Sequence, residues 1–135
     1  MVTNCHGLKG FLDTEKEKNM NRFNFLESPF IDLVNCHDGI GTIKHNDAFP
    51  EDSYASNLMF LHHTVLPPGT TVGNHAHEND EEIYIVLEGK GLYTQDDETF
   101  PVKAGDILRN KPYGTHGLVN TEDVELKLLV FCVEI

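Results

Sequence analysis

From Pro29 onward, short hydrophobic runs alternate with groups of Gly, Pro, Asn and Asp residues. Short apolar runs bounded by turn-forming residues are typical of β-strands. We predict strands at Ile31–Val34, Gly41–Lys44, Asn57–Leu66, Glu82–Leu87, Gly91–Gln95, Thr99–Val102, Asp106–Arg109, Gly117–Val119 and Val124–Val133. Asp96–Asp97 and Thr121–Asp123 are predicted to form hairpin turns. This pattern predicts an all-β sandwich or barrel that occupies residues 29–135.

Residues 1–28 have a different texture, with a charged and polar stretch at Asp13–Asn19. We interpret them as an N-terminal arm, either a short helix or a mobile segment, and Met20 is an alternative start. The formal net charge of −12 argues against binding to nucleic acid or to anionic membranes. No apolar run has membrane-spanning length, and residues 1–12 lack the apolar stretch of a signal peptide. We therefore expect a cytoplasmic protein.

The strongest chemical signal is a pair of histidines followed by a carboxylate. His75 and His77 are separated by one residue, so in an extended segment both imidazoles lie on the same face. The acidic residues 78–81 can form a turn that brings Glu82 back toward them. Imidazole and carboxylate ligands suit a divalent cation such as zinc, iron, manganese, nickel or cobalt. A third histidine, His116, follows a turn that contains Pro112 and Gly114.

These residues resemble the two sequence motifs of the cupins. The first motif, G(X)5HXH(X)3–4E(X)6G, is matched at every spacing by Gly69, His75, His77, Glu82 and Gly89. The second, G(X)5PXG(X)2H(X)3N, is matched by Gly105, His116 and Asn120, whereas Pro112 and Gly114 lie one position late. The resemblance implies a double-stranded β-helix, or jelly-roll, barrel. It also implies that His75, His77, Glu82 and His116 bind one divalent metal ion, and that Asn120 supports the fold.

Strand alternation identifies candidates for the proton-transfer group. If Glu82 points into the barrel, Tyr84 points the same way, as an acid or base or as a packed core residue. His62 and His63 are consecutive, so one faces the cavity, but Pro67–Gly69 interrupts the count and leaves both open as catalytic candidates. Arg109 is a candidate for binding a substrate carboxylate or phosphate, or is a solvated surface charge. The remaining histidines, His6, His37 and His45, have no motif support and are interpreted as surface or structural residues.

The predicted site suggests two classes of function. A metal with these four ligands keeps two octahedral positions, which suit a sugar, sugar acid, or hydroxy or keto acid. We favour a metal-dependent enzyme with isomerase, lyase or decarboxylase chemistry, or a dioxygenase if the metal is iron. The alternative is a non-catalytic cupin that binds a sugar or another small metabolite. The predicted strands that follow Glu82 and Asp123 are apolar on both faces, which favours a homodimer.

Overall fold

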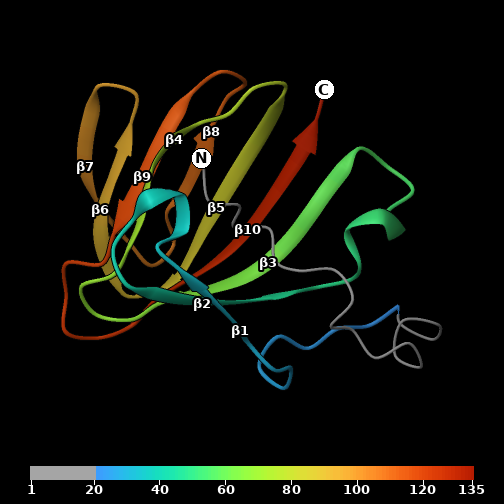
Figure 1. Cartoon of the computed structure of the whole chain (residues 1–135), viewed down its shortest axis with the longest axis horizontal. Helices are drawn as coiled ribbons and strands as arrows, with labels where there is room; N and C mark the ends of the chain where they lie inside the picture. The colour runs from blue at the N-terminus through green and yellow to red at the C-terminus, as the bar shows by residue number, and fades with distance from the viewer. Residues whose placement is uncertain (1–20) are drawn as a thin grey trace.

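The computed structural model describes residues 21–135, which form two antiparallel sheets facing each other (Figure 1). The six-stranded sheet has the order β1-β2-β3-β10-β5-β8, and the four-stranded sheet has the order β4-β9-β6-β7. Two short 3₁₀ turns, η1 (Cys36–Asp38) and η2 (Glu51–Ser53), interrupt the strands. The strands are β1 (Ile31–Val34), β2 (Thr42–Asp47), β3 (Leu58–Leu66), β4 (Thr71–Ala76), β5 (Asp80–Glu88), β6 (Lys90–Gln95), β7 (Glu98–Lys103), β8 (Ile107–Asn110), β9 (Thr115–Val119) and β10 (Leu126–Glu134).

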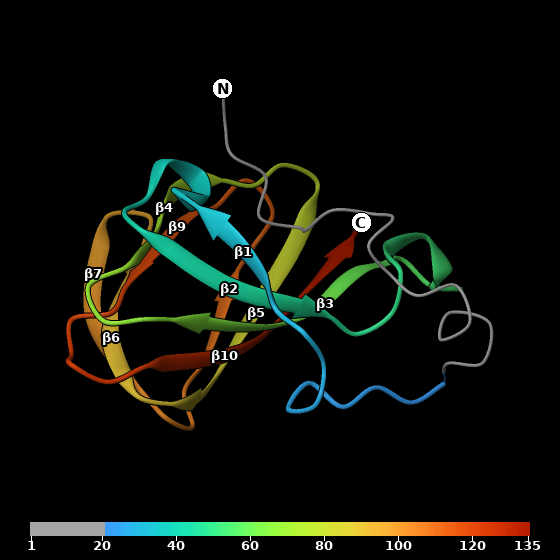
Figure 2. The same ribbon diagram turned by 60° about the horizontal axis from the view of Figure 1, so that its bottom comes forward.

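This arrangement confirms the predicted all-β, double-stranded β-helix barrel. Seen in a second orientation, the two sheets enclose one interior (Figure 2). Inward-facing side chains from both sheets fill that interior, because successive residues of a strand alternate between its two faces. On β5, Glu82, Tyr84 and Val86 are buried inside, as alternation predicted, while Ile83 and Ile85 lie on the outer face and are only partly buried. Within residues 21–135, no helix has the length and apolar character needed to span a lipid bilayer.

Two local predictions need correction. The segment before the paired histidines was expected only to be extended, whereas it forms a full strand, β4. Residues 121–123 were predicted as a hairpin turn, but β9 and β10 belong to different sheets, so this segment crosses between sheets. The buried Asn120 side chain stabilises the crossing. Its amide donates to the carbonyl oxygens of Leu66 (2.9 Å) and Val124 (2.8 Å), and its Oδ1 accepts from the Glu122 backbone N–H (2.9 Å).

Of the predicted N-terminal arm, residues 21–28 lie within the described part, where they contain a turn and neither a helix nor a strand. The Asn46 side chain of β2 holds this segment by donating to the backbone carbonyls of Phe25 (3.1 Å) and Ser28 (3.2 Å). The Phe25 ring lies 4.2 Å from the His63 ring, measured between centroids. The segment therefore covers part of the outer face of the six-stranded sheet. Three predictions fall outside the described residues: the charged stretch as a short helix or mobile segment, the alternative start at Met20, and the role of His6.

Candidate metal centre

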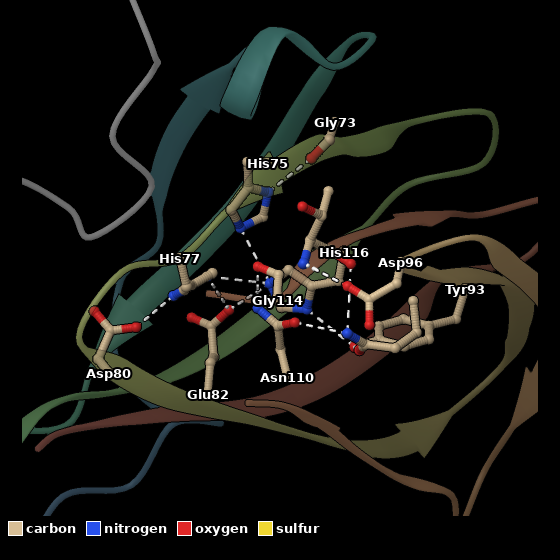
Figure 3. A network of polar contacts seen from close by, with 12 residues as sticks. Gly73, His75, His77, Asp80, Glu82, Tyr93, Asp96, Asn110, Gly114 and His116 are labelled. Atoms are coloured by element: carbon tan, nitrogen blue, oxygen red, sulfur yellow. Dashed lines mark hydrogen bonds and ion pairs between the residues drawn. The ribbon is translucent and has the colours of Figure 1, made fainter. Parts of the chain in front are cut away.

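Three strands from the two sheets bring the four predicted ligands together (Figure 3). His75 near the end of β4 pairs directly with His116 of β9, so the two imidazoles are neighbours across the strand pair. His77 follows β4 immediately, and Glu82 projects inward from β5 of the opposite sheet. The shifted Pro112–Gly114 turn does not disturb this arrangement, because His116 remains in register with His75. The structure therefore gathers His75, His77, Glu82 and His116 between the sheets.

The distances between the donor atoms fit a single cation. His116 Nε2 lies 3.1 Å from His75 Nε2 and 3.2 Å from His77 Nε2, while Glu82 Oε1 lies 2.9 Å from His116 Nε2 and 3.1 Å from His77 Nε2. Ligands that bind one metal at about 2.1 Å are separated by about 3.0 Å in an octahedron and about 3.4 Å in a tetrahedron. The measured separations match the octahedral edge more closely.

The surroundings of Glu82 support the same fit. Its Oε1 atom is buried, and its contacts with the two imidazoles do not meet hydrogen-bond geometry. A buried carboxylate oxygen without a well-directed donor is costly unless a cation balances it. These four residues could therefore hold a divalent metal ion.

Each histidine is oriented by an acceptor at its far nitrogen. His75 Nδ1–H donates to the Gly73 carbonyl (2.7 Å), and His77 Nδ1–H donates to Asp80 Oδ1 (2.6 Å). His116 Nδ1–H donates to the phenolic oxygen of Tyr93 (3.0 Å). In neutral histidine, a proton on Nδ1 leaves the lone pair on Nε2, which is the atom that faces the shared centre in all three residues. Such partners fix both the tautomer and the ring orientation of metal-binding histidines.

A directed chain of hydrogen bonds extends behind His116. Burial raises the pKa of Tyr93, with a further contribution from Glu82, so the phenol keeps its proton and donates to Gln95 Oε1 (2.7 Å). Gln95 Nε2–H donates to Asn110 Oδ1 (2.7 Å), and Asn110 Nδ2–H donates to the Gly114 carbonyl (3.2 Å). The same carbonyl accepts the backbone N–H of His77 (2.9 Å). This series of hydrogen bonds therefore connects the side chain of His116 with the backbone of His77.

The pKa values of the site follow from burial and from the nearby charges. Burial, reinforced by the neighbouring His116 and His37, lowers the pKa of His75 to about 3, so its imidazole is neutral at pH 7. Burial alone would lower the pKa of His77, but the carboxylates of Glu82 and Asp80 outweigh burial and raise the pKa to about 9. Burial alone would raise the pKa of Glu82, but the contacts with His116 and His77 outweigh burial and hold the pKa well below its usual range. Without a metal, therefore, His77 carries a proton that balances the ionised Glu82.

A small cavity of about 30 Å³ adjoins the centre. His75 and Glu82 form part of its wall, together with Tyr84 and His62. Its remaining walls are Leu33, Cys36, His37, Ile43, Phe60, Thr64, Val72, Leu128 and Val130. Complete burial, followed by the charge of Glu82, raises the pKa of Tyr84 well above its ordinary value. In the metal-free protein Tyr84 is therefore a protonated hydrogen-bond donor rather than a base, which differs from the proton acceptor that the sequence also allowed.

Of the two consecutive histidines, His62 is the one that faces the cavity. Its Nε2 lies 2.8 Å from Asp47 Oδ1, and its Nδ1 lies 3.4 Å from Nδ1 of the buried His45. The register explains the grouping, since Asp47 pairs with His62 across β2 and β3, and His45 precedes Asp47 by two residues on the same face of β2. Both nitrogens of His62 are thus in close contact with neighbouring side chains, and His45, Asp47 and His62 form a compact group of two imidazoles and one carboxylate.

The structure does not bring the other two candidates to the cavity. His63 faces outward, where the rings of Phe25 and Phe30 pack against it, and burial lowers its pKa. Arg109 is exposed on the outer face of β8, whereas its neighbours Leu108 and Asn110 point inward and are buried. The geometry therefore does not support catalysis by His63 or substrate binding by Arg109, because alternation turns both away from the interior.

Several residues near the centre carried no recognisable signal in the sequence. Asp80 could have been noticed as a carboxylate three residues after His77, but Tyr93, Gln95 and Asn110 reach the centre only through strand pairing. His37 was interpreted as a surface or structural residue, yet it lines the cavity and its ring stacks on that of His75. His45 was interpreted in the same way, and it is completely buried beside His62.

Comparisons with known proteins identify the family of this chain. Residues 62–132 match the model of the cupin domain. The chain is similar to an oxalate-binding protein of Thermotoga maritima, with 28% identity over 101 residues, 75% of this chain and 84% of that protein. It is 42% identical over 76 residues to an uncharacterized protein of Methanocaldococcus jannaschii, covering 56% of this chain and 61% of the other.

Among solved structures, the fold of this protein is similar to the crystal structure of a predicted oxalate decarboxylase from Thermotoga maritima. The TM-score is 0.80 at 26% identity, over 83% of this chain and 97% of the other. The matching family model covers more than half of the chain and contains the four candidate ligands. The chain therefore belongs to the cupin domain family.

Proposed function

We propose that His75, His77, Glu82 and His116 hold one divalent cation, and that the protein is an enzyme acting on a small oxygen-rich acid. The proposed chemistry is of the isomerase, lyase or decarboxylase type. The observation that carries the proposal is the convergence of three imidazoles and one carboxylate beside a small cavity that is also lined by the phenol of Tyr84 and the imidazole of His62. A resident metal ion would act as a Lewis acid that polarises a carbonyl or carboxylate group.

The size and lining of the cavity favour the smallest of the ligands that the sequence suggested. A volume of about 30 Å³ exceeds the 10–15 Å³ that one water molecule needs, but it accepts only a few atoms without side-chain movement. A two- or three-carbon acid fits this limit better than a sugar. No lysine or arginine is among the described residues that line the cavity, so the acid's charge would be balanced at the metal centre. The names of the similar curated protein and of the similar solved structure, both from Thermotoga maritima, refer to oxalate and support the same class of ligand.

The chain's own residues supply hydrogen bonding and proton transfer in this proposal. Tyr84 keeps its proton at neutral pH and donates it, or a hydrogen bond, to an oxygen of the bound acid. His62 is the second proton-transfer candidate, and the Asp47 carboxylate lies 2.8 Å from its Nε2. The apolar walls formed by Leu33, Ile43 and Val130 exclude bulk water, which strengthens these interactions.

The test is reconstitution of the purified protein with manganese, iron, cobalt, nickel or zinc, each at one equivalent. Each form is incubated with oxalate, glycolate and pyruvate, and consumption of the acid and release of carbon dioxide are measured. We expect turnover of at least one acid by at least one metal form. The His116→Ala variant, which removes one proposed ligand, should show none. Turnover that does not depend on added metal, or that survives in His116→Ala, would contradict the proposed centre.

A second function, the non-catalytic binding of a small acid, is favoured by one observation. The similar curated protein from Thermotoga maritima is named for binding oxalate. Isothermal titration of each metal form separates the two functions. Saturable binding of an acid that is then recovered unchanged in every metal form would identify a binding protein. Consumption of the bound acid would identify an enzyme.

A further inference from the structure

The 3₁₀ turn η1 places a histidine directly against the candidate metal centre. Figures 1 and 2 show η1, in cyan, close to β4. The His37 ring on this turn is stacked on the His75 ring, with 3.6 Å between centroids and 9° between planes. Both side chains line the cavity. A histidine outside the cupin motifs thus forms part of the wall beside a candidate ligand.

The backbone that holds His37 is in an unfavourable conformation. Asn35, His37 and Asp38 have φ angles of 51°, 52° and 61°, which lie in the left-handed region. Asparagine, aspartate and histidine occur in this region more often than other non-glycine residues, but any residue with a side chain is uncommon there. Residues held in this way cost on the order of 1 kcal/mol or more and cluster at functional sites. The position of His37 is therefore maintained against a local preference.

Two glycines allow the turn to approach β4 this closely. A Cβ atom on Gly73 would collide with the carbonyl oxygen of His37, and one on Gly39 would lie 2.5 Å from the Thr71 carbonyl oxygen. Thr71 also fastens the segment, because its Oγ1 accepts the Ile40 backbone N–H (2.7 Å) and its own N–H donates to the Ile40 carbonyl (3.0 Å). Close packing and hydrogen bonds together hold the His37 ring in place.

We propose that His37 is a ligand-binding residue of the cavity, donating an N–H to an oxygen of a small acid held at the metal centre. This inference rests on the proposed function. The parallel stack keeps the His37 imidazole beside His75, so a ligand that reaches the centre also meets His37. The nearby walls formed by Leu33, Ile43 and Val72 are apolar and offer no side-chain donor. His37 thus supplies a polar contact on a side of the cavity where these neighbours supply none.

Two variants separate ligand binding from a structural role. His37→Phe retains an aromatic ring that can stack on His75 but loses the N–H donor. His37→Asn tolerates the left-handed backbone but loses the ring. The matched control is His63→Phe, the same substitution at a buried histidine on the outer face. Each protein is loaded with cobalt, its metal content is measured by mass spectrometry, and oxalate, glycolate and pyruvate binding is measured by isothermal titration.

We expect all four proteins to hold one cobalt ion per chain, and the His63→Phe control to bind acid like the wild type. Both His37 variants should bind the acid about 10- to 100-fold more weakly, as expected for the loss of a hydrogen bond to a charged group. The melting temperature of His37→Asn should stay close to that of the wild type, because asparagine also accepts the left-handed backbone conformation. A purely structural histidine would instead show a fall in melting temperature with unchanged affinity.

The remaining outcomes distinguish an error in the role of His37 from an error in the proposed function. Wild-type affinity in His37→Phe would overturn the role of His37 and leave the proposed function intact. Loss of cobalt from His37→Phe would show that His37 only supports His75, which also overturns ligand contact. If neither variant folds, His37 is structural. If the wild-type cobalt protein binds none of the three acids, the proposed ligand class fails, and the inference fails with it.

Discussion

Replacement of Tyr93 by phenylalanine should weaken metal binding although Tyr93 is not a proposed ligand. The hydroxyl accepts from His116 Nδ1–H (3.0 Å) and donates to Gln95 Oε1 (2.7 Å), and the side chain is buried. The substitution keeps the ring but leaves both partners without this contact. His116 is then free to place its proton on Nε2, the nitrogen that must present a lone pair to the cation.

The size of the effect can be estimated from these contacts. Loss of a partner that orients a metal-binding histidine typically lowers metal affinity about 10- to 100-fold, which corresponds to about 1.4–2.7 kcal/mol. Leaving a buried donor or acceptor without a partner costs about 1–3 kcal/mol of folding stability. The metal-free variant should therefore also be less stable. Added metal should stabilise it less than it stabilises the wild type at the same metal concentration.

Metal affinity is measured by competition with a chromophoric chelator, using zinc and cobalt in turn. Thermal unfolding with and without metal reports the two stability effects separately. Tyr113→Phe is the control, because this tyrosine side chain is 73% exposed and lies in the turn before His116. A dissociation constant for Tyr93→Phe within twofold of the wild type, with only the metal-free stability reduced, would refute the idea that Tyr93 prepares His116 for the cation.

Four further predictions follow from the structure. His116→Ala should lose metal, measured by mass spectrometry, yet keep the far-ultraviolet circular dichroism of the β-fold; full metal occupancy would exclude His116 as a ligand. Tyr84→Phe should hold metal normally but turn over any accepted acid about 100- to 10,000-fold more slowly, and an unchanged rate would remove Tyr84 from the mechanism. In the metal-free protein the raised pKa of His77, about 9, contributes stability that is complete below about pH 6.5 and is lost as the pH rises toward 9. Urea unfolding with a chelator present should therefore show a steeper loss over that range in the wild type than in His77→Gln, and equal slopes would contradict this. Light scattering should detect a homodimer at micromolar concentration, which Leu129→Glu on the apolar outer face of the six-stranded sheet should dissociate; a monomeric wild type would contradict the assembly.

The strands and their inner faces could be predicted because both depend on residues close in sequence. Alternation on β5 correctly placed Glu82 and Tyr84 inside and Ile83 outside. The spacing of the two motifs also anticipated which four side chains would meet. Short-range geometry accounts for His75, His77 and Glu82, since residues two apart share a strand face and a turn can return the chain to its neighbour. His116 was added by the resemblance to the second motif, and the structure brings it to His75 through the pairing of β4 with β9.

The surroundings of the centre depend on pairing between distant segments, which local patterns do not encode. Tyr93 meets His116 because β6 pairs with β9, and Asn110 reaches Gln95 because β8 lies beside β5 in the facing sheet. The choice of His62 over His63 required the pairing of β3 with β2, since the Pro67–Gly69 turn prevents counting from His75. Residue types alone specify none of these contacts.

His37 and Arg109 show most clearly the difference between what the local sequence predicts and what the tertiary structure decides. Arg109 lies within the second motif, yet strand alternation turns it to the outer face. His37 lies far from both motifs, yet a left-handed turn packed against two glycines stacks it on His75. Local composition and spacing therefore predicted an all-β domain, and the motif resemblance predicted the β-helix barrel and the four side chains that converge within it. The remaining wall of the cavity was set by strand register and close backbone packing, which arise only when the two sheets assemble.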